Sequence, residues 1–188
     1  MAVDFMKRRQ EMLDDIAEQF LKIDQAQIDE LVEAILKADR IYTSGWGRAG
    51  NIVRILGMNM SQLGRLVYCV GDNGTPAIKP EDLLIIFSGS GNTKTISLIC
   101  AQAKEQGATV ALISGGGKES TMGKIADINI EIPCLPRDEP REGGEPAPTR
   151  GLSIYQTAFI LNEFIEDCVM YKTGQTMDDI IKNHNNLE

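Results

Sequence analysis

The sequence is poor in side chains that bind metal ions, since its 188 residues include one histidine and four cysteines. The cysteines, at positions 69, 100, 134 and 168, lie far apart, and none belongs to a Cys-x-x-Cys pair. Structural zinc sites need four such ligands, usually in closely spaced pairs. We therefore predict no metal and no cofactor, and we expect reduced thiols, as is usual in the cytoplasm.

Long apolar stretches and an excess of positive charge are also missing. No apolar run approaches the roughly 20 residues needed to cross a bilayer, and the first residues do not resemble a secretion signal. Acidic residues outnumber basic ones by 27 to 19, for a formal net charge of −8. This balance argues against binding to nucleic acid or to an anionic membrane. We expect a cytoplasmic protein that holds any anionic ligand by local groups.

Short apolar runs alternate with segments of helical spacing, a pattern typical of an α/β protein with a parallel sheet covered by helices on both faces. We predict strands at 40–44, 66–70, 83–87, 109–113 and 127–132. Two amphipathic helices precede the first strand, and a short helix is expected near 120–126. A long helix should run from Gly151 to about Lys172.

The whole chain, 1–188, is expected to form one domain, because no repeat or low-complexity tract divides it. Leading helices occupy 1–38, and C-terminal helices occupy 151–188. The segment 133–150 is irregular and rich in proline and arginine. A connection of this length is either a solvated loop or a lid that brings an arginine to a ligand, and the sequence leaves both open.

A hydroxyl- and glycine-rich turn follows the third predicted strand and precedes a helix. It consists of Ser88, Gly89, Ser90, Gly91, Asn92 and Thr93. The first amides of a helix lack intrahelical partners and carry partial positive charge, so they attract anions. Glycines let the backbone curl towards a ligand, and three hydroxyls exceed what a helix cap needs. The turn is interpreted as a phosphate site; the alternative is an ordinary N-cap formed by Ser90 or Thr93.

A second glycine turn, at 45–50, follows the first predicted strand and has the pattern Gly-x-Gly-x-x-Gly. Since ligands bind beyond the carboxyl ends of parallel strands, we expect both turns on one rim. The pattern also occurs in dinucleotide-binding proteins, and Asp72 lies where their ribose-binding carboxylate would be. An NAD-dependent dehydrogenase is therefore a hypothesis. Against it, the chain leaves no room for a substrate domain, and Trp46 and Arg48 would crowd a pyrophosphate.

Together the two motifs resemble the sugar isomerase (SIS) domain family and, within it, the 6-phospho-3-hexuloisomerase family. The likeness covers about 25–188; Ser-Gly-Ser-Gly-x-Thr is its most specific part, and the Asn-His-x-x-Leu-Glu end also matches. The resemblance implies a three-layer αβα sandwich with a five-stranded parallel sheet, of the flavodoxin or Rossmann type. It also implies a homodimer or homotetramer that binds a phosphorylated sugar at the subunit interface.

The resemblance assigns residues of both turns to the phosphate site, with Arg48 on the side opposite the hydroxyls. The assigned residues are Ser88, Gly89, Ser90, Gly91, Asn92, Thr93, Ser44, Gly45 and Arg48. Two positions depart from the family. Ala49 removes an expected hydroxyl, and Asn92 stands where glutamate or arginine is common.

The start of the long helix departs most, because the family carries there a glutamate proposed as the catalytic base. Tyr155 takes its place in Ile154-Tyr-Gln-Thr157. A base works best with a pKa near ambient pH, and a free tyrosine, with a pKa of about 10, is a poor one. His184, the single histidine, has a suitable unperturbed pKa. It is either a surface residue or a catalytic residue acting in a neighbouring subunit's site.

We therefore expect a sugar-phosphate isomerase of the aldose–ketose type that works through an enediol(ate), with His184 and Tyr155 as candidate catalytic residues. The alternative from a different class is a non-catalytic sugar-phosphate sensor that kept the phosphate turn and lost its base. The NAD-dependent dehydrogenase is the third and least favoured hypothesis.

Overall fold

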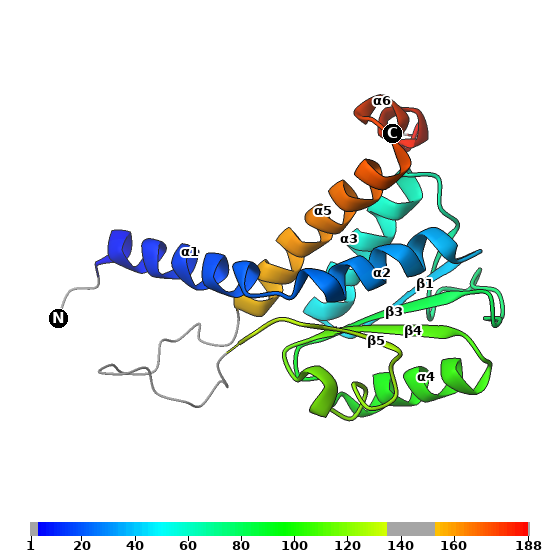
Figure 1. Cartoon of the computed structure of the whole chain (residues 1–188), viewed down its shortest axis with the longest axis horizontal. Coiled ribbons are helices and arrows are strands. Elements are labelled where there is room, and N and C mark those ends of the chain that lie inside the picture. The colour runs from blue at the N-terminus through cyan, green and yellow to red at the C-terminus, as the bar shows by residue number, and fades with distance from the viewer. Residues whose placement is uncertain (1–3, 135–152, 188) are drawn as a thin grey trace.

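The computed structural model describes residues 4–134 and 153–187, and it contains the parallel five-stranded sheet that the sequence predicts (Figure 1). The strands are β1 (Ile41–Ser44), β2 (Val67–Cys69), β3 (Leu83–Ser88), β4 (Thr109–Ser114) and β5 (Ile128–Glu131). They lie in the order β2-β1-β3-β4-β5, and every neighbouring pair is parallel. All residues of the central strand β3 are buried, as expected for a strand covered on both faces.

Helices cover both faces of the sheet, which confirms the three-layer αβα sandwich (Figure 1). The helices are α1 (Phe5–Leu21), α2 (Gln25–Lys37), α3 (Arg48–Gln62), α4 (Lys94–Glu105), α5 (Ser153–Thr173) and α6 (Met177–Asn183). Ile85 and Phe87 of β3 belong to the core under α2, α3 and α5, while Leu84 and Ile86 belong to the core under α4. None of the helices in the described part of the chain is both long and apolar enough to span a membrane.

The first helix, α1, extends away from the rest of the molecule, and the C-terminal end of α1 packs against α5 (Figure 1). There Phe20 meets Phe164 of α5 edge-on, with ring centroids 5.7 Å apart. Nearer the N-terminus the apolar side chains are uncovered, and Phe5 is 71% and Leu13 61% exposed. The predicted apolar face of α1 is therefore only partly used within one chain.

The prediction of a short helix near 120–126 is wrong. A 3₁₀ turn, η1 (Gly117–Glu119), is followed there by a series of hydrogen-bonded turns. Two backbone donors of this segment bond to the turn after β3 instead, since Thr121 N donates to Asn92 Oδ1 at 2.8 Å and Met122 N donates to the carbonyl oxygen of Gly91 at 3.0 Å. The segment is therefore bound to the turn after β3 instead of being wound into a helix.

The C-terminal helices agree with the prediction where the structure describes them. α5 ends before Gly174, whose φ of 71° suits glycine. α6 begins with a capping box formed by Thr176 and Asp179. The start predicted at Gly151 and the greater part of the irregular segment, from residue 135 on, lie outside the described residues.

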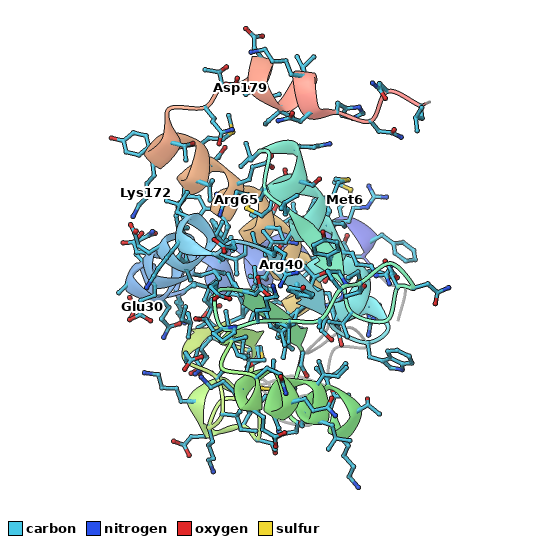
Figure 2. All side chains as sticks on the ribbon, turned by 90° about the vertical axis from the view of Figure 1, so that its right-hand side faces the viewer. Met6, Glu30, Arg40, Arg65, Lys172 and Asp179 are labelled. Atoms are coloured by element: carbon cyan, nitrogen blue, oxygen red, sulfur yellow. The ribbon has the colours of Figure 1, made fainter. Side chains whose placement is uncertain are left out.

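Two arginines that precede strands, Arg40 and Arg65 (both labelled in Figure 2), make polar contacts where the strands begin. Arg40, just before β1, donates to both carboxylate oxygens of the buried Asp82, just before β3, at 2.9 and 2.6 Å. Arg65, after α3, donates to the carbonyl oxygens of Leu36 and Ala38 at the end of α2. These contacts lie at the edge opposite the two glycine turns, so they support the scaffold and not the rim.

The strand order places the turns after β1 and β3 next to each other. β1 and β3 are neighbours, but α3 connects β1 to β2 on one face, and α4 connects β3 to β4 on the other. In open parallel sheets, ligands bind at such a reversal of direction, beyond the carboxyl ends of the strands. The turns at 45–50 and 88–93 therefore share one crevice.

Backbone contacts explain two glycines of the first turn. A Cβ on Gly50 would lie 2.7 Å from the carbonyl oxygen of Gly45. A Cβ on Gly45 would lie 3.0 Å from the carbonyl oxygen of Phe87, at the end of β3. Without side chains at these positions, the start of α3 closes directly against β3.

We expect Gly50→Ala to lower the free energy of unfolding by about 1–3 kcal/mol, because the new methyl group meets only backbone and cannot fit without a shift. Gly74→Ala is the matched control, since nothing lies within 4 Å of a Cβ there. Its effect should stay within about 0.5 kcal/mol. Urea denaturation measures both. Equal stability of the two variants would contradict the close approach.

Candidate functional site

The turn after β3 leaves the start of α4 open. The hydroxyls of Ser88 and Thr93 bond to each other at 3.2 Å, and Thr93, the N-cap residue, makes no side-chain cap. Ser97 N donates to Thr93 O at 2.9 Å, as the first amide bonded within the helix. The amides of residues 94–96 thus have no intrahelical partner. The ordinary helix cap is not formed, so this end of α4 is available to an anion.

A third glycine run, Gly115–Gly117, supports this turn, although its place after a predicted strand was the only signal for it in the sequence. Gly115 N donates to the carbonyl oxygen of Gly89 at 3.0 Å. Gly91 has a φ of 68°, and a Cβ on it would lie 2.2 Å from Ser120 Oγ. The turn after β3 therefore rests tightly on the turns after β4.

Asn92 is bonded within the protein at both ends of its side chain. Its Oδ1 accepts from the amide and the hydroxyl of Thr121, both at 2.8 Å. Its Nδ2 donates to the carbonyl oxygen of Ser90 at 2.9 Å. These bonds give Asn92 a clear part in shaping the turn, whereas a direct contact between Asn92 and phosphate stays a prediction.

The turn after β1 supplies a buried hydroxyl and an exposed cation. Ser44 is 4% exposed, and its hydroxyl makes no hydrogen bond among residues 4–134 and 153–187. Gly47, with a φ of 61°, is the N-cap of α3 and offers no side chain to close the helix. Arg48, the next residue, is exposed. Both helix starts at the rim are therefore open, with a guanidinium beside them.

Tyr155, in the first turn of α5, contacts both glycine turns. The guanidinium carbon of Arg48 lies 4.2 Å from the centre of its ring. The ring meets Phe87 edge-on, with centroids 5.8 Å apart. A Cβ on Gly89 would lie 3.3 Å from the tyrosine hydroxyl. The sequence predicted Tyr155 at the site but not that it joins the two turns.

A cavity of about 300 Å³ opens between the starts of α3 and α5. Its lining residues are Arg48, Asn51, Ile52, Tyr155, Gln156 and Phe159. Among the described residues of this lining, Arg48 is the one that is charged at neutral pH, and none of them carries a carboxylate or an imidazole. In a chain with a net charge of −8, the cavity is thus locally cationic. The cavity therefore suits an anion, but none of its described lining residues is a suitable catalytic base.

His184 lies far from this cavity in its own chain. The preceding residue, Asn183, donates from Nδ2 to the carbonyl oxygen of Gln62 at 2.8 Å, at the C-terminal end of α3. Arg48 begins that 15-residue helix, so the two ends are about 21 Å apart at 1.5 Å per residue. One chain does not bring His184 to the site, and its role in a neighbouring subunit stays a prediction.

Two carboxylates lie further along α5. Glu163 accepts from Asn59 of α3 at 3.2 Å. Burial, together with the charges of Glu163 and Asp167, raises the pKa of Glu166 above its usual value. Neither residue lines the cavity.

The geometry does not favour the dinucleotide hypothesis. The order β2-β1-β3-β4-β5 is that of flavodoxin-like sheets, whereas the dinucleotide-binding order continues through two mononucleotide halves. Asp72, the candidate ribose-binding residue, pairs with Arg54 at 3.0 Å. The Gly-x-Gly-x-x-Gly pattern here serves the contact with β3.

Comparison with known proteins gives a consistent result. The family model for the SIS domain matches residues 34–149. The chain is 32% identical over 149 residues to the 3-hexulose-6-phosphate isomerase of Bacillus subtilis, which covers 79% of this chain and 80% of that protein. It is 29% identical over 150 residues to the enzyme of the same name from Mycobacterium gastri, covering 79% and 74%.

A crystal structure of a Methanococcus jannaschii protein has the same fold. It aligns with a TM-score of 0.81 and 27% identity, covering 95% of this chain and 99% of that one. A molecular function of 3-hexulose-6-phosphate isomerase was inferred for that protein from its structure.

We expect Asn92→Asp to keep the fold and to weaken anion binding. The carboxylate can still accept from Thr121, but it puts negative charge beside the open start of α4, where it competes with an anionic ligand. The dissociation constant for inorganic phosphate, measured by calorimetry, should rise about tenfold. Tm should fall slightly, because the bond from Asn92 Nδ2 to the carbonyl oxygen of Ser90 is lost. Gln102→Glu makes the same change of charge further along α4 and is the control. Equal phosphate affinities for the two variants would contradict the role of the open helix start.

Proposed function

Because the chain belongs to the SIS domain family, we propose that it is a sugar-phosphate isomerase that interconverts a 3-hexulose 6-phosphate and fructose 6-phosphate. The proposal is carried by the open α4 amides and the hydroxyls of the 88–93 turn, together with Tyr155, which contacts both that turn and the Arg48 guanidinium. Such groups bind phosphate monoesters through charge-assisted hydrogen bonds. Their number suits a terminal phosphate better than a dinucleotide.

The reaction moves a carbonyl between neighbouring carbons of the sugar. A base removes the proton from the carbon beside the carbonyl, and the electron pair of that bond forms an enediolate. A proton is then returned to the former carbonyl carbon, while the neighbouring hydroxyl loses its proton and becomes the new carbonyl. Holding the phosphate in the 88–93 turn positions the reacting carbons without taking part in the proton transfers.

None of the described residues that line the cavity is a suitable catalytic base. We propose that His184 of the partner subunit provides it, because an unperturbed imidazole titrates near neutral pH. The site would then be completed at the interface between two copies, as a homodimer or homotetramer. Tyr155 and Arg48 would remain on the chain that binds the phosphate.

The exposed side of α1 supports an oligomer. Phe5, Met6 and Leu13 are 71%, 69% and 61% exposed, which is unusual for apolar side chains gathered on one helix. A second copy could cover them. We also propose that the protein works in the cytoplasm, where its thiols, none of which forms a disulfide in the described part of the chain, would stay reduced.

A non-catalytic sugar-phosphate sensor is the second candidate function. The observation that favours it is the cavity between α3 and α5, where the described lining residues include a guanidinium but neither a carboxylate nor an imidazole. A sensor would bind several sugar phosphates and convert none of them.

Turnover separates the two candidates. The purified protein should convert 3-hexulose 6-phosphate into fructose 6-phosphate, followed by coupled reduction of NADP. Ser90→Ala should raise KM about tenfold, because one hydrogen bond to a charged phosphate is lost. Turnover of any sugar phosphate excludes the sensor. Thermal stabilisation by fructose 6-phosphate without turnover would reject the isomerase.

If His184 acts across the interface, two variants that are each nearly inactive at a substrate concentration far below KM should restore each other. One chain carries His184→Asn, and the other carries Ser88→Ala with Ser90→Ala. A mixed pair then has one site with both defects and one with neither, so random pairing should return about a quarter of wild-type activity. Co-expressed chains with different tags allow the measurement. Activity no higher than that of each variant alone would contradict a shared site.

A further inference from the structure

We propose that Tyr155 is a positioning residue: the face of its ring holds the Arg48 guanidinium over the phosphate crevice, and its hydroxyl is not the catalytic group. This inference rests on the proposed function, since it concerns binding of the same sugar phosphate. It differs from the catalytic role that the sequence suggested for Tyr155.

The guanidinium of Arg48 contacts the face of the Tyr155 ring. The distance of 4.2 Å from guanidinium carbon to ring centroid is well within the reach of a cation–π interaction, about 6 Å. Among the described residues, no carboxylate pairs with Arg48 and no carbonyl accepts from it. Arg40, Arg54 and Arg65, in contrast, each donate to an oxygen of the protein. The Arg48 donors therefore remain available to a phosphate.

The position of Arg48 explains why such a partner is needed. Arg48 is the first residue of α3, where the partial positive charge of the helix start repels a cation. The open start of α4, across the crevice, adds charge of the same sign. A carboxylate would relieve this repulsion by neutralising the guanidinium, which would spoil an anion site. The negative face of an aromatic ring relieves it and leaves the donors unoccupied.

Tyr155 is itself fixed against the second turn. Phe87 meets its ring at an angle of 69° between the planes, an edge-on contact. The hydroxyl packs against the backbone of Gly89, where an added Cβ would be 3.3 Å away. The ring thus sets the position of Arg48 relative to the hydroxyls of the phosphate turn.

Contacts from α1 hold the start of α5 that carries this ring. Gln19 donates from Nε2 to Ser153 Oγ at 2.7 Å and accepts at Oε1 from Thr157 Oγ1 at 2.8 Å. Ser153 and Thr157 flank Tyr155 by two residues on either side. The first turn of α5 is therefore anchored on both sides of the ring.

A double-mutant cycle on fructose 6-phosphate binding tests the coupling. Tyr155→Leu and Arg48→Ala should each weaken binding about tenfold, and the double variant should bind no more weakly than Arg48→Ala alone. Tyr155→Phe should weaken binding less than Tyr155→Leu does, because the ring remains. The effect of Phe159→Leu, which changes another aromatic of the cavity, should add to that of Arg48→Ala. Additive losses for Tyr155→Leu and Arg48→Ala would overturn the proposal.

Replacing Tyr155 with ring-fluorinated phenylalanines separates the cation–π interaction from the packing of the ring. Fluorine withdraws density from the ring face but nearly preserves its shape, so affinity should fall as fluorines are added while Tm stays constant. If Tyr155→Phe instead lowers kcat by more than about a hundredfold at unchanged KM, the hydroxyl acts in the transition state and the proposal is wrong.

Binding and turnover together distinguish this proposal from the proposed function. A protein that binds fructose 6-phosphate but turns over no sugar phosphate is not an isomerase, and its binding cycle still decides the role of Tyr155. If the protein is an active isomerase but the effects of Tyr155→Leu and Arg48→Ala on binding are additive, the positioning role of Tyr155 is wrong and the proposed function stands. A wild-type protein that binds no sugar phosphate would overturn both.

Discussion

The site depends on a backbone contact in which Gly45 lies against Gly50 on one side and against the carbonyl oxygen of Phe87 on the other. Because neither glycine carries a side chain, the start of α3 closes against the end of β3. The turns after two neighbouring parallel strands then lie side by side, where we propose that a single ligand binds. This contact brings the backbone at Arg48 close to the end of β3, and the Tyr155 ring then holds the guanidinium of Arg48.

The sheet and the phosphate turn could be predicted because their signals are local. β3 and β4 are short apolar runs, and the hydroxyls and glycines after β3 are consecutive. The prediction of a helix at 120–126 was wrong because it considered only the local sequence. The backbone of this segment bonds to a residue distant in sequence, since Met122 N donates to the carbonyl oxygen of Gly91. The stacking of Arg48 on Tyr155 likewise depends on how α5 docks on α3, which no local pattern reports.

Phosphate binding and proton transfer draw on different parts of the molecule. The groups that suit a phosphate come together within one chain, from the ends of β1 and β3 and the start of α4. The single histidine follows α6, beside the far end of α3. If the proposed chemistry holds, binding needs one copy and turnover needs two. Affinity and rate could then change independently during evolution, because separate surfaces determine them.

If the proposed phosphate site is correct, the folding stability of the protein depends on the concentration of its ligand. If the amides at 94–96 hold the phosphate as proposed, the folded chain offers this site and the unfolded chain does not, so ligand binding stabilises the fold. By mass action, a ligand at about a hundred times its dissociation constant adds about 2.7 kcal/mol to folding stability. This is a large part of the roughly 5–15 kcal/mol that holds a typical domain folded. In a cell, the unfolded fraction exposed to proteases would fall as sugar phosphate accumulates, so abundance of the protein would follow supply of its ligand without any dedicated regulator.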